Sequence, residues 1–141
     1  MVDDDIDDRE IFREALAIVN PSLKLYFADN GSDAMKKLET SAEIPDIIFS
    51  DINMPIMNGI QFLEEIKKST RLSSLPVVMY TTSSSANNES QCQTLGAEHY
   101  IIKPTRFERI CHEIRFSLEK IANLYSRSVN LKPSFSNSRK Y

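Results

Sequence analysis

Three short apolar runs, each ending in a polar residue, constrain the fold of this chain more than any other feature. The runs are DIIFSD (46–51), LPVVMYT (75–81) and HYIIK (99–103). Their continuous apolar character is typical of parallel strands that are buried on both faces of a sheet. Segments with apolar residues at helical spacing lie between them. This alternation predicts an α/β fold, with right-handed crossovers and helices on both faces of a parallel sheet.

Helical spacing also places the helices that separate these strands. A first helix has apolar residues at helical spacing from Ile11 to Val19 and ends before Pro21, Ser32 caps a short second helix, and a third begins at Gly59. The segment 83–96 has few apolar side chains, so we expect the fourth helix to be poorly anchored.

The last helix is the most clearly marked, because Thr105 and Glu108 match a capping box. From Ser126 onward the chain is rich in Ser, Asn and basic residues and has no periodicity, which predicts a flexible basic tail. We therefore expect a domain over 1–125 and a tail over 126–141. The expected buried stripe of the last helix is Phe107, Ile110, Ile114, Leu118, Ile121 and Tyr125.

Two further strands are less complete. LKLYFA (23–28) alternates well enough for a strand, and an acid pair at Asp3 and Asp4 follows only Met1 and Val2. The first strand is thus either a stump or continues into residues that precede this sequence.

Composition limits the alternatives. The 141 residues, 41% of them hydrophobic, suffice for one core and hence one domain. A net charge of −3 does not favour a nucleic-acid partner. The sequence shows neither a long apolar span nor a signal peptide, so we expect a cytoplasmic protein without a membrane partner. Cys92 and Cys111 are expected to be reduced thiols.

Ligands of parallel sheets bind beyond the carboxyl ends of the strands. At these ends the predicted topology gathers Asp3, Asp4, Asp51, Thr81 and Lys103. Clustered carboxylates suit Mg²⁺, whereas a lysine and a threonine can hold the oxygens of a phosphoryl group. Since aspartate is a known nucleophile, the sequence predicts a site that places a phosphoryl group on a carboxylate.

The motifs carry a family resemblance. VDD at 2–4, DINMPIMNG at 51–59, Thr81, Tyr100 and KP at 103–104 stand in the order and at the spacings of a family. Residues 1–125 thereby resemble the receiver domain of bacterial two-component response regulators, and in particular the stand-alone, CheY-like receivers. The resemblance implies a flavodoxin-like, doubly wound sheet of five parallel strands in the order 2-1-3-4-5.

The resemblance also implies a phosphoryl-accepting role. Asp51 would accept phosphate from a sensor histidine kinase or phosphotransfer protein. Asp4 and Asp51 would bind Mg²⁺ directly with the backbone carbonyl of Asn53, and Asp3 would assist through water. The chain would turn over no external substrate and would only slowly lose its own phosphate.

Further residues would transmit the signal. Thr81 and Lys103 would sense the phosphoryl group, Tyr100 would change rotamer, and the bond between Lys103 and Pro104 would be cis. The resemblance further implies that Asn53 and Ser83 would border the path of the attacking water and tune dephosphorylation.

Output is expected through contact with another protein, at the face of the fourth helix, fifth strand and fifth helix, because the tail is too short to bury a core. The sequence identifies neither the kinase nor that partner, and it leaves a homodimer open.

Two other functions compete with this interpretation. Asp3, Asp5, Asp7 and Glu14 fall at ligand positions of a calcium-binding EF-hand loop, but Asp8 stands where that loop needs glycine. The expected role of Asp5, Asp7 and Asp8 is instead to favour the helix N-terminus.

The second alternative is a Mg²⁺-dependent phosphatase with an aspartyl-phosphate intermediate. Such enzymes need an acid two residues after the nucleophile, where this chain has Asn53. A third possibility, a fold of this class with an inert edge, gives no reason for acids, threonine and lysine at the strand ends.

Overall fold

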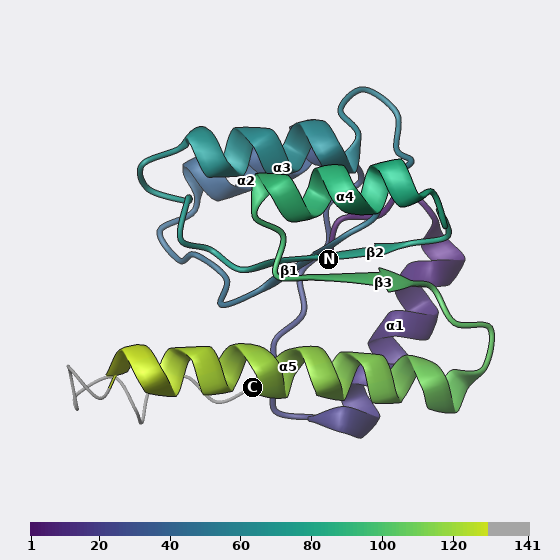
Figure 1. The fold of residues 1–141 in the computed structure, drawn as a ribbon. Helices are drawn as coiled ribbons and strands as arrows, with labels where there is room; N and C mark the ends of the chain where they lie inside the picture. Colours follow the sequence, from purple (N-terminus) through teal and green to yellow (C-terminus); the bar gives the residue numbers. More distant parts are fainter. Residues whose placement is uncertain (130–141) are drawn as a thin grey trace. The chain divides into compact units, whose positions relative to one another are not determined.

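The structure, a computed structural model, describes residues 1–129 (Figure 1). These residues divide into two compact units. The first unit comprises residues 1–9 and 26–103, and the second comprises residues 10–25 and 104–129 of the described chain. The sheet and the predicted site residues from Asp3 to Lys103 all belong to the first unit. In chain order the elements are α1 (Ile6–Val19), α2 (Gly31–Thr40), β1 (Ile48–Ser50), α3 (Gly59–Lys68), β2 (Val77–Thr81), α4 (Ala86–Leu95), β3 (His99–Ile102) and α5 (Phe107–Val129).

The three predicted apolar runs form a parallel sheet in the order β1-β2-β3. Val2 extends this order, because it forms single parallel bridges both to Ser50 at the end of β1 and to Ala28 on its other side. The Val2 N–H donates to the Phe49 carbonyl at 2.8 Å, and the Asp3 N–H donates to the Ala28 carbonyl at 3.1 Å. Segments therefore follow the predicted order 2-1-3-4-5, with the first two strands reduced to bridges.

The strand predicted over 23–28 is wrong in extent, since only Ala28 pairs. Within the described residues, the parallel partner of this segment is the short segment around Val2. The Met1 carbonyl accepts from the Ala28 N–H at 3.0 Å, and the amino group of Met1 donates to the Tyr26 carbonyl at 2.7 Å. Residues 23–27 therefore form no regular strand pairing with the described residues.

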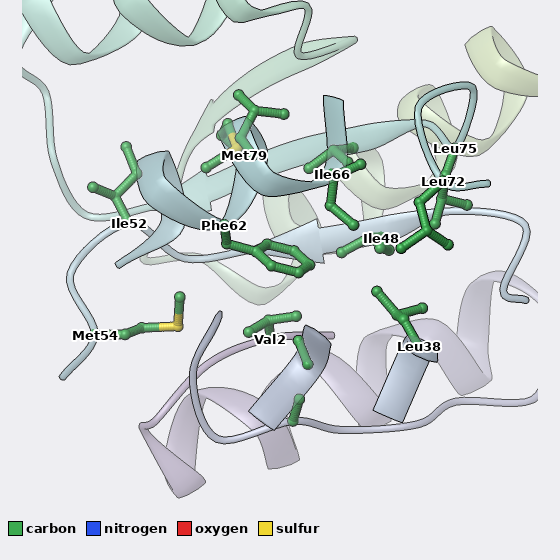
Figure 2. Packing of buried hydrophobic residues seen from close by; sticks show 14 of the residues in the cluster. Val2, Leu38, Ile48, Ile52, Met54, Phe62, Ile66, Leu72, Leu75 and Met79 are labelled. Carbon is green, nitrogen blue, oxygen red and sulfur yellow. The ribbon is translucent and has the colours of Figure 1, made fainter. Parts of the chain in front are cut away.

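One hydrophobic cluster fills the first unit, and α2, α3 and α4 lie together on one side of the sheet (Figure 1). Phe62, Leu63 and Ile66 of α3 are fully buried, as are Val77 and Met79 of β2. Figure 2 shows the ring of Phe62 in the middle of this cluster. Burial of such a side chain contributes about 1.5–3 kcal/mol to the free energy of unfolding.

The start of α2 differs from the prediction, whereas α3 begins at Gly59 as predicted. The N-cap of α2 is Asn30, whose side chain accepts from the Asp33 N–H at 3.0 Å, so the cap predicted at Ser32 is wrong by two residues. Asn58 caps α3 and forms a reciprocal capping box with Gln61. Asparagine is among the strongest N-cap residues, and both helices use it.

The weak anchoring predicted for the fourth helix agrees with the burial of its side chains. Cys92 of α4 is fully buried, Leu95 is half-buried and Ala86 is exposed. Ser85 caps the start of this helix, and Gly96 ends it in the left-handed region with φ 96°.

The last helix is longer than predicted and begins later. The Arg106 carbonyl accepts from the Ile110 N–H at 3.1 Å, which makes Arg106 the N-cap, so the capping box of Thr105 and Glu108 is wrong. The helix continues to Val129, past the predicted boundary at 125, and residues 130–141 of the predicted tail lie outside the described residues. Within the predicted stripe, Ile110, Ile114, Leu118 and Ile121 are buried, whereas Phe107 and Tyr125 are half-buried.

Candidate functional site

The acid pair and the acid after β1 meet at the carboxyl edge of the sheet. One carboxylate oxygen from each of Asp3, Asp4 and Asp51 lies within 4.8 Å of the other two. Asp3 follows the Val2 bridge and Asp51 follows β1, so neighbouring parallel segments bring them together. Asp3 and Asp51 are buried and Asp4 is exposed, which leaves the cluster open to solvent on one side.

Lys103 completes this edge from the end of β3. Its Nζ donates to Asp3 Oδ2 at 2.8 Å, to Asp8 Oδ2 at 2.8 Å and to Asp51 Oδ2 at 3.4 Å. The side chain is only 8% exposed, and its ammonium also lies 5.6 Å from the centre of the Tyr80 ring. The ammonium therefore stands among carboxylates in a site with little water to screen it.

Burial affects the pKa of both Lys103 and Asp3. Burial by itself lowers the pKa of Lys103, but the hydrogen bonds to Asp3 and Asp8 and the charge of Asp51 outweigh it and raise that pKa. Burial raises the pKa of Asp3, against the hydrogen bonds from Lys103 and from the Asp5 N–H that lower it. The lysine is thus held in its charged form, ready to face an anion.

The carboxylates fit a hard divalent cation. Mg²⁺ takes oxygen ligands, usually one or two carboxylates, and keeps several waters. Asp3, Asp4 and Asp51 supply such oxygens at close range, and the exposure of Asp4 gives a cation a path from solvent. Asn53 is exposed two residues after Asp51, and the predicted role of its carbonyl stays a prediction.

The loop after Asp51 is shaped by a close backbone approach. A Cβ added to Gly59 would lie 1.9 Å from the Asp51 carbonyl oxygen, so only glycine fits there. The Gly59 N–H donates to the Ile52 carbonyl at 2.8 Å, and the Ile52 N–H donates to Asp51 Oδ1 at 2.7 Å. Ile56 has φ 69°, an unfavourable value for a β-branched residue, and it is 85% exposed. These contacts fix the Asp51 carboxylate on a tight loop.

Thr81 and Tyr100 meet at one residue, Ser83. Thr81 is fully buried, and its Oγ1 accepts from the Ser83 N–H at 3.2 Å. The Tyr100 hydroxyl donates to the Ser83 carbonyl at 2.8 Å, and the Asn88 side chain donates to Ser83 Oγ at 2.9 Å. Ser83 thereby joins the end of β2 to β3 and to α4.

One predicted feature of the site, the cis bond before Pro104, is wrong. Among residues 1–129 no peptide bond is cis, so the bond between Lys103 and Pro104 is trans. The trans form is favoured by about 0.5–1 kcal/mol before proline. It is compatible with the observed contacts, because the Lys103 N–H still donates to the Thr81 carbonyl at 2.7 Å.

Two residues of the first turn of α1 belong to the site although sequence reasoning gave them no such role. Asp8 binds Lys103, whereas only a helix-terminus role was predicted for it. Arg9 donates through Nε to the Asp3 carbonyl at 2.6 Å, pairs with Asp29, and lies 5.6 Å from the Phe27 ring centre. Their positions one turn after the acid pair were the available signal.

Asp5, by contrast, has the predicted capping role. Its carboxylate accepts from the Asp8 N–H at 3.0 Å at the start of α1. The helix covers Asp7 and Glu14, so a calcium-binding loop over these residues is excluded.

An α/β domain with an acidic cluster and a lysine at the carboxyl edge defines a class of signalling proteins, the phosphoryl-accepting receivers. The family model of the response regulator receiver domain matches residues 1–115. The two-component response regulator ORR3 of rice (Oryza sativa) is 30% identical over 116 residues, which cover 80% of this chain and 86% of that protein. The chain belongs to the response regulator receiver family and is a receiver domain of two-component signalling.

Other relatives and solved structures agree. The sensor histidine kinase CheAY of Helicobacter pylori is 30% identical over 131 residues, 93% of this chain but only 15% of that protein. The phosphorylated cyanobacterial phytochrome response regulator RcpA superposes with a TM-score of 0.77 at 28% identity, covering 84% of this chain and 88% of that one. For CheY4 of Vibrio cholerae the TM-score is 0.68 at 26% identity, with 81% and 92% covered. The predicted fold class is confirmed.

None of the helices over residues 1–129 combines the length and apolar character needed to cross a membrane.

Proposed function

We propose that Asp51 accepts a phosphoryl group from a histidine kinase or a phosphotransfer protein, with Mg²⁺ held at the acid cluster. The observation that carries this proposal is the placement of the Asp51 carboxylate, within 4.8 Å of oxygens of Asp3 and Asp4 and 3.4 Å from Lys103 Nζ. A nucleophile between a cation site and an ammonium faces positive charge on both sides, which suits an incoming anion.

In the transfer, an Asp51 carboxylate oxygen forms a bond to phosphorus while the phosphorus–nitrogen bond of the donor phosphohistidine breaks. The electron pair of that bond stays on the imidazole nitrogen. Asp4, Asp51 and the backbone carbonyl of Asn53 would hold Mg²⁺ directly, with Asp3 assisting through water, and the ion would supply positive charge opposite the incoming phosphoryl group. The Lys103 ammonium and the Thr81 hydroxyl donate hydrogen bonds to oxygens of the phosphoryl group.

The same proposal excludes turnover of an external substrate. Asn53 stands two residues after Asp51 and has no carboxyl group to exchange a proton. Loss of the phosphoryl group then depends on how well water is positioned against the acyl phosphate, so it is slow.

The output partner is proposed to bind the surface of α4 and β3. Thr81 responds to the phosphoryl group at the end of β2, and Ser83 links it to Tyr100 of β3 and to Asn88 of α4. Since α4 buries only Cys92 fully, it is the element of this unit most easily biased between two packings.

The test is labelling with Mg²⁺ and acetyl phosphate, followed by intact-mass measurement. The wild type should gain one phosphoryl group that hydroxylamine removes, and Asp51→Asn should gain none, because an amide is a poor nucleophile. Asp7→Asn, an exposed site in the first turn of α1, is the matched control and should label like the wild type. Labelling that survives Asp51→Asn overturns the assignment.

A further inference from the structure

All the hydrogen-bond donors of the Lys103 ammonium are engaged. A lysine ammonium has three donors, and those of Lys103 point to Asp3, Asp8 and Asp51. The two short bonds, at 2.8 Å, go to Asp3 and Asp8, whereas the bond to Asp51 is the long one at 3.4 Å. The ammonium therefore lies closer to Asp3 and Asp8 than to Asp51, the proposed acceptor.

Asp8 differs from the other two carboxylates in its surroundings. Asp3 is fully buried at the end of the Val2 bridge, but the Asp8 side chain is 33% exposed in the first turn of α1. Its bond to Lys103 is thus partly screened by water and easier to exchange than the bond to Asp3. Its backbone N–H is bound by Asp5, which fixes the carboxylate over Lys103 from a capped helix start.

We propose that Asp8 is a positioning residue that competes with a phosphoryl group for Lys103. The inference rests on the proposed function of Asp51. A phosphoryl group on Asp51 brings anionic oxygens that need the lysine as donor and counter-ion. Because Asp8 occupies one of the three donors of Lys103, it lowers the affinity of the site for a phosphoryl group. Release of Lys103 from Asp8 accompanies phosphorylation.

Beryllofluoride, a phosphoryl mimic that adds to aspartate in the presence of Mg²⁺, is the probe for the test. Asp8→Asn should bind it about threefold more tightly than the wild type, because a partly exposed ion pair carries a modest energy. Asp7→Asn, from the same turn of α1, is the matched control and should bind like the wild type. Asp8→Glu keeps the charge and should restore the wild-type affinity.

Two measurements separate positioning from simple charge repulsion. In a Lys103→Met background the gain from Asp8→Asn should vanish, since the competitor acts through the lysine. The ¹⁵Nζ resonance of Lys103 should move in Asp8→Asn and on addition of beryllofluoride, and should stay in place in Asp7→Asn. This resonance reports on the ion pair even where the Lys103→Met variant binds the probe too weakly to measure.

The outcomes distinguish this inference from the proposed function. If the wild type does not bind beryllofluoride with Mg²⁺, the proposed function fails and the inference fails with it. If the wild type binds it and Asp8→Asn binds equally or more weakly, only the inference about Asp8 is overturned. A gain that persists in the Lys103→Met background also overturns it.

Discussion

The Tyr100 hydroxyl donates a hydrogen bond to the backbone carbonyl of Ser83, 2.8 Å away, and so ties β3 to the segment that leads into α4. We expect phosphorylation to change hydrogen-exchange protection in residues 83–97 much more than in residues 107–121. The first segment has little buried apolar surface, whereas the second carries Ile110, Ile114, Leu118 and Ile121 of α5, all buried and at helical spacing. Tyr100→Phe should shrink the change in 83–97 because the link to Ser83 is lost.

The measurement is hydrogen exchange followed by mass spectrometry, with and without beryllofluoride and Mg²⁺. Unchanged exchange in 83–97, together with a rise in partner affinity, would show that the signal leaves through another surface.

Metal binding should depend on Asp4 even though it is the exposed member of the cluster. Asp4→Ala removes one of three carboxylates whose oxygens lie within 4.8 Å of one another. We expect the Mg²⁺ affinity, measured by NMR titration, to fall at least about tenfold. Asp5→Ala tests the neighbouring carboxylate, which caps α1, and should leave the Mg²⁺ affinity nearly unchanged. Equal Mg²⁺ affinity in Asp4→Ala and wild type would remove Asp4 from the proposed ligands.

The lifetime of the phosphoryl group should depend on residues 53 and 83. Asn53 is exposed, so a lysine there can be accommodated without disturbing the core. We expect Asn53→Lys and Ser83→Tyr to change the dephosphorylation rate without abolishing phosphorylation, because both would alter the path of the attacking water. The decay of the labelled protein, followed by intact mass, gives the rate. Identical decay across these variants and the wild type would contradict the prediction.

Arg9 should matter for stability more than its place on a helix suggests. Arg9→Leu loses the bond to the Asp3 carbonyl, the pair with Asp29 and the contact with the Phe27 ring. We expect the free energy of unfolding in urea to fall by about 1–3 kcal/mol. Arg13→Leu, four residues further along α1 and 54% exposed, is the control and should change it by less than about 0.5 kcal/mol. A similar loss in both variants would argue against a special role for Arg9.

Alkaline pH should destabilise the fold through Cys92. Burial raises the pKa of this thiol from 9.0 to about 11. The unfolded chain releases the thiol proton first, so stability from this group is present below pH 9 and is lost as pH rises toward 11. The expected slope is up to about 1.4 kcal/mol per pH unit. Cys92→Ala should be less stable than the wild type at neutral pH. Its free energy of unfolding, measured in urea, should fall less steeply between pH 9 and pH 11 than that of the wild type. Equal pH slopes in the two proteins would refute the assignment.

The sequence predicted the site best where strand ends determine it. Each buried apolar run ends at a fixed edge, so Asp51, Thr81 and Lys103 could be placed there without coordinates. Asp8 could not be assigned in the same way. The orientation of the first turn of α1 decides which of its side chains contacts Lys103, and the sequence does not determine that orientation. The sequence also placed the cap of α2 at Ser32 instead of Asn30. Both residue types cap helices well, and local sequence does not fix a helix boundary to within one or two residues.

The strand expected over 23–28 shows a different limit. Its alternation describes a half-buried surface, but pairing also requires partner backbone, and only the residues around Val2 supply it. The cis bond expected before Pro104 rested on the family resemblance, and the structure has the trans form that is ordinarily favoured before proline.

The single-residue bridges at Val2 couple the acid cluster to the integrity of the sheet. The Val2 carbonyl accepts from the Asp51 N–H at 2.9 Å, and the Val2 N–H donates to the Phe49 carbonyl at 2.8 Å. Asp3 and Asp4 directly follow Val2. Losing these few bonds would scatter the carboxylates, so a cation that binds them also selects the paired state. By thermodynamic linkage, a cation at one hundred times its dissociation constant adds about 2.7 kcal/mol to the folded state. Under the proposed function, the concentration of Mg²⁺ would therefore affect both the phosphorylation of Asp51 and the resistance of the protein to unfolding.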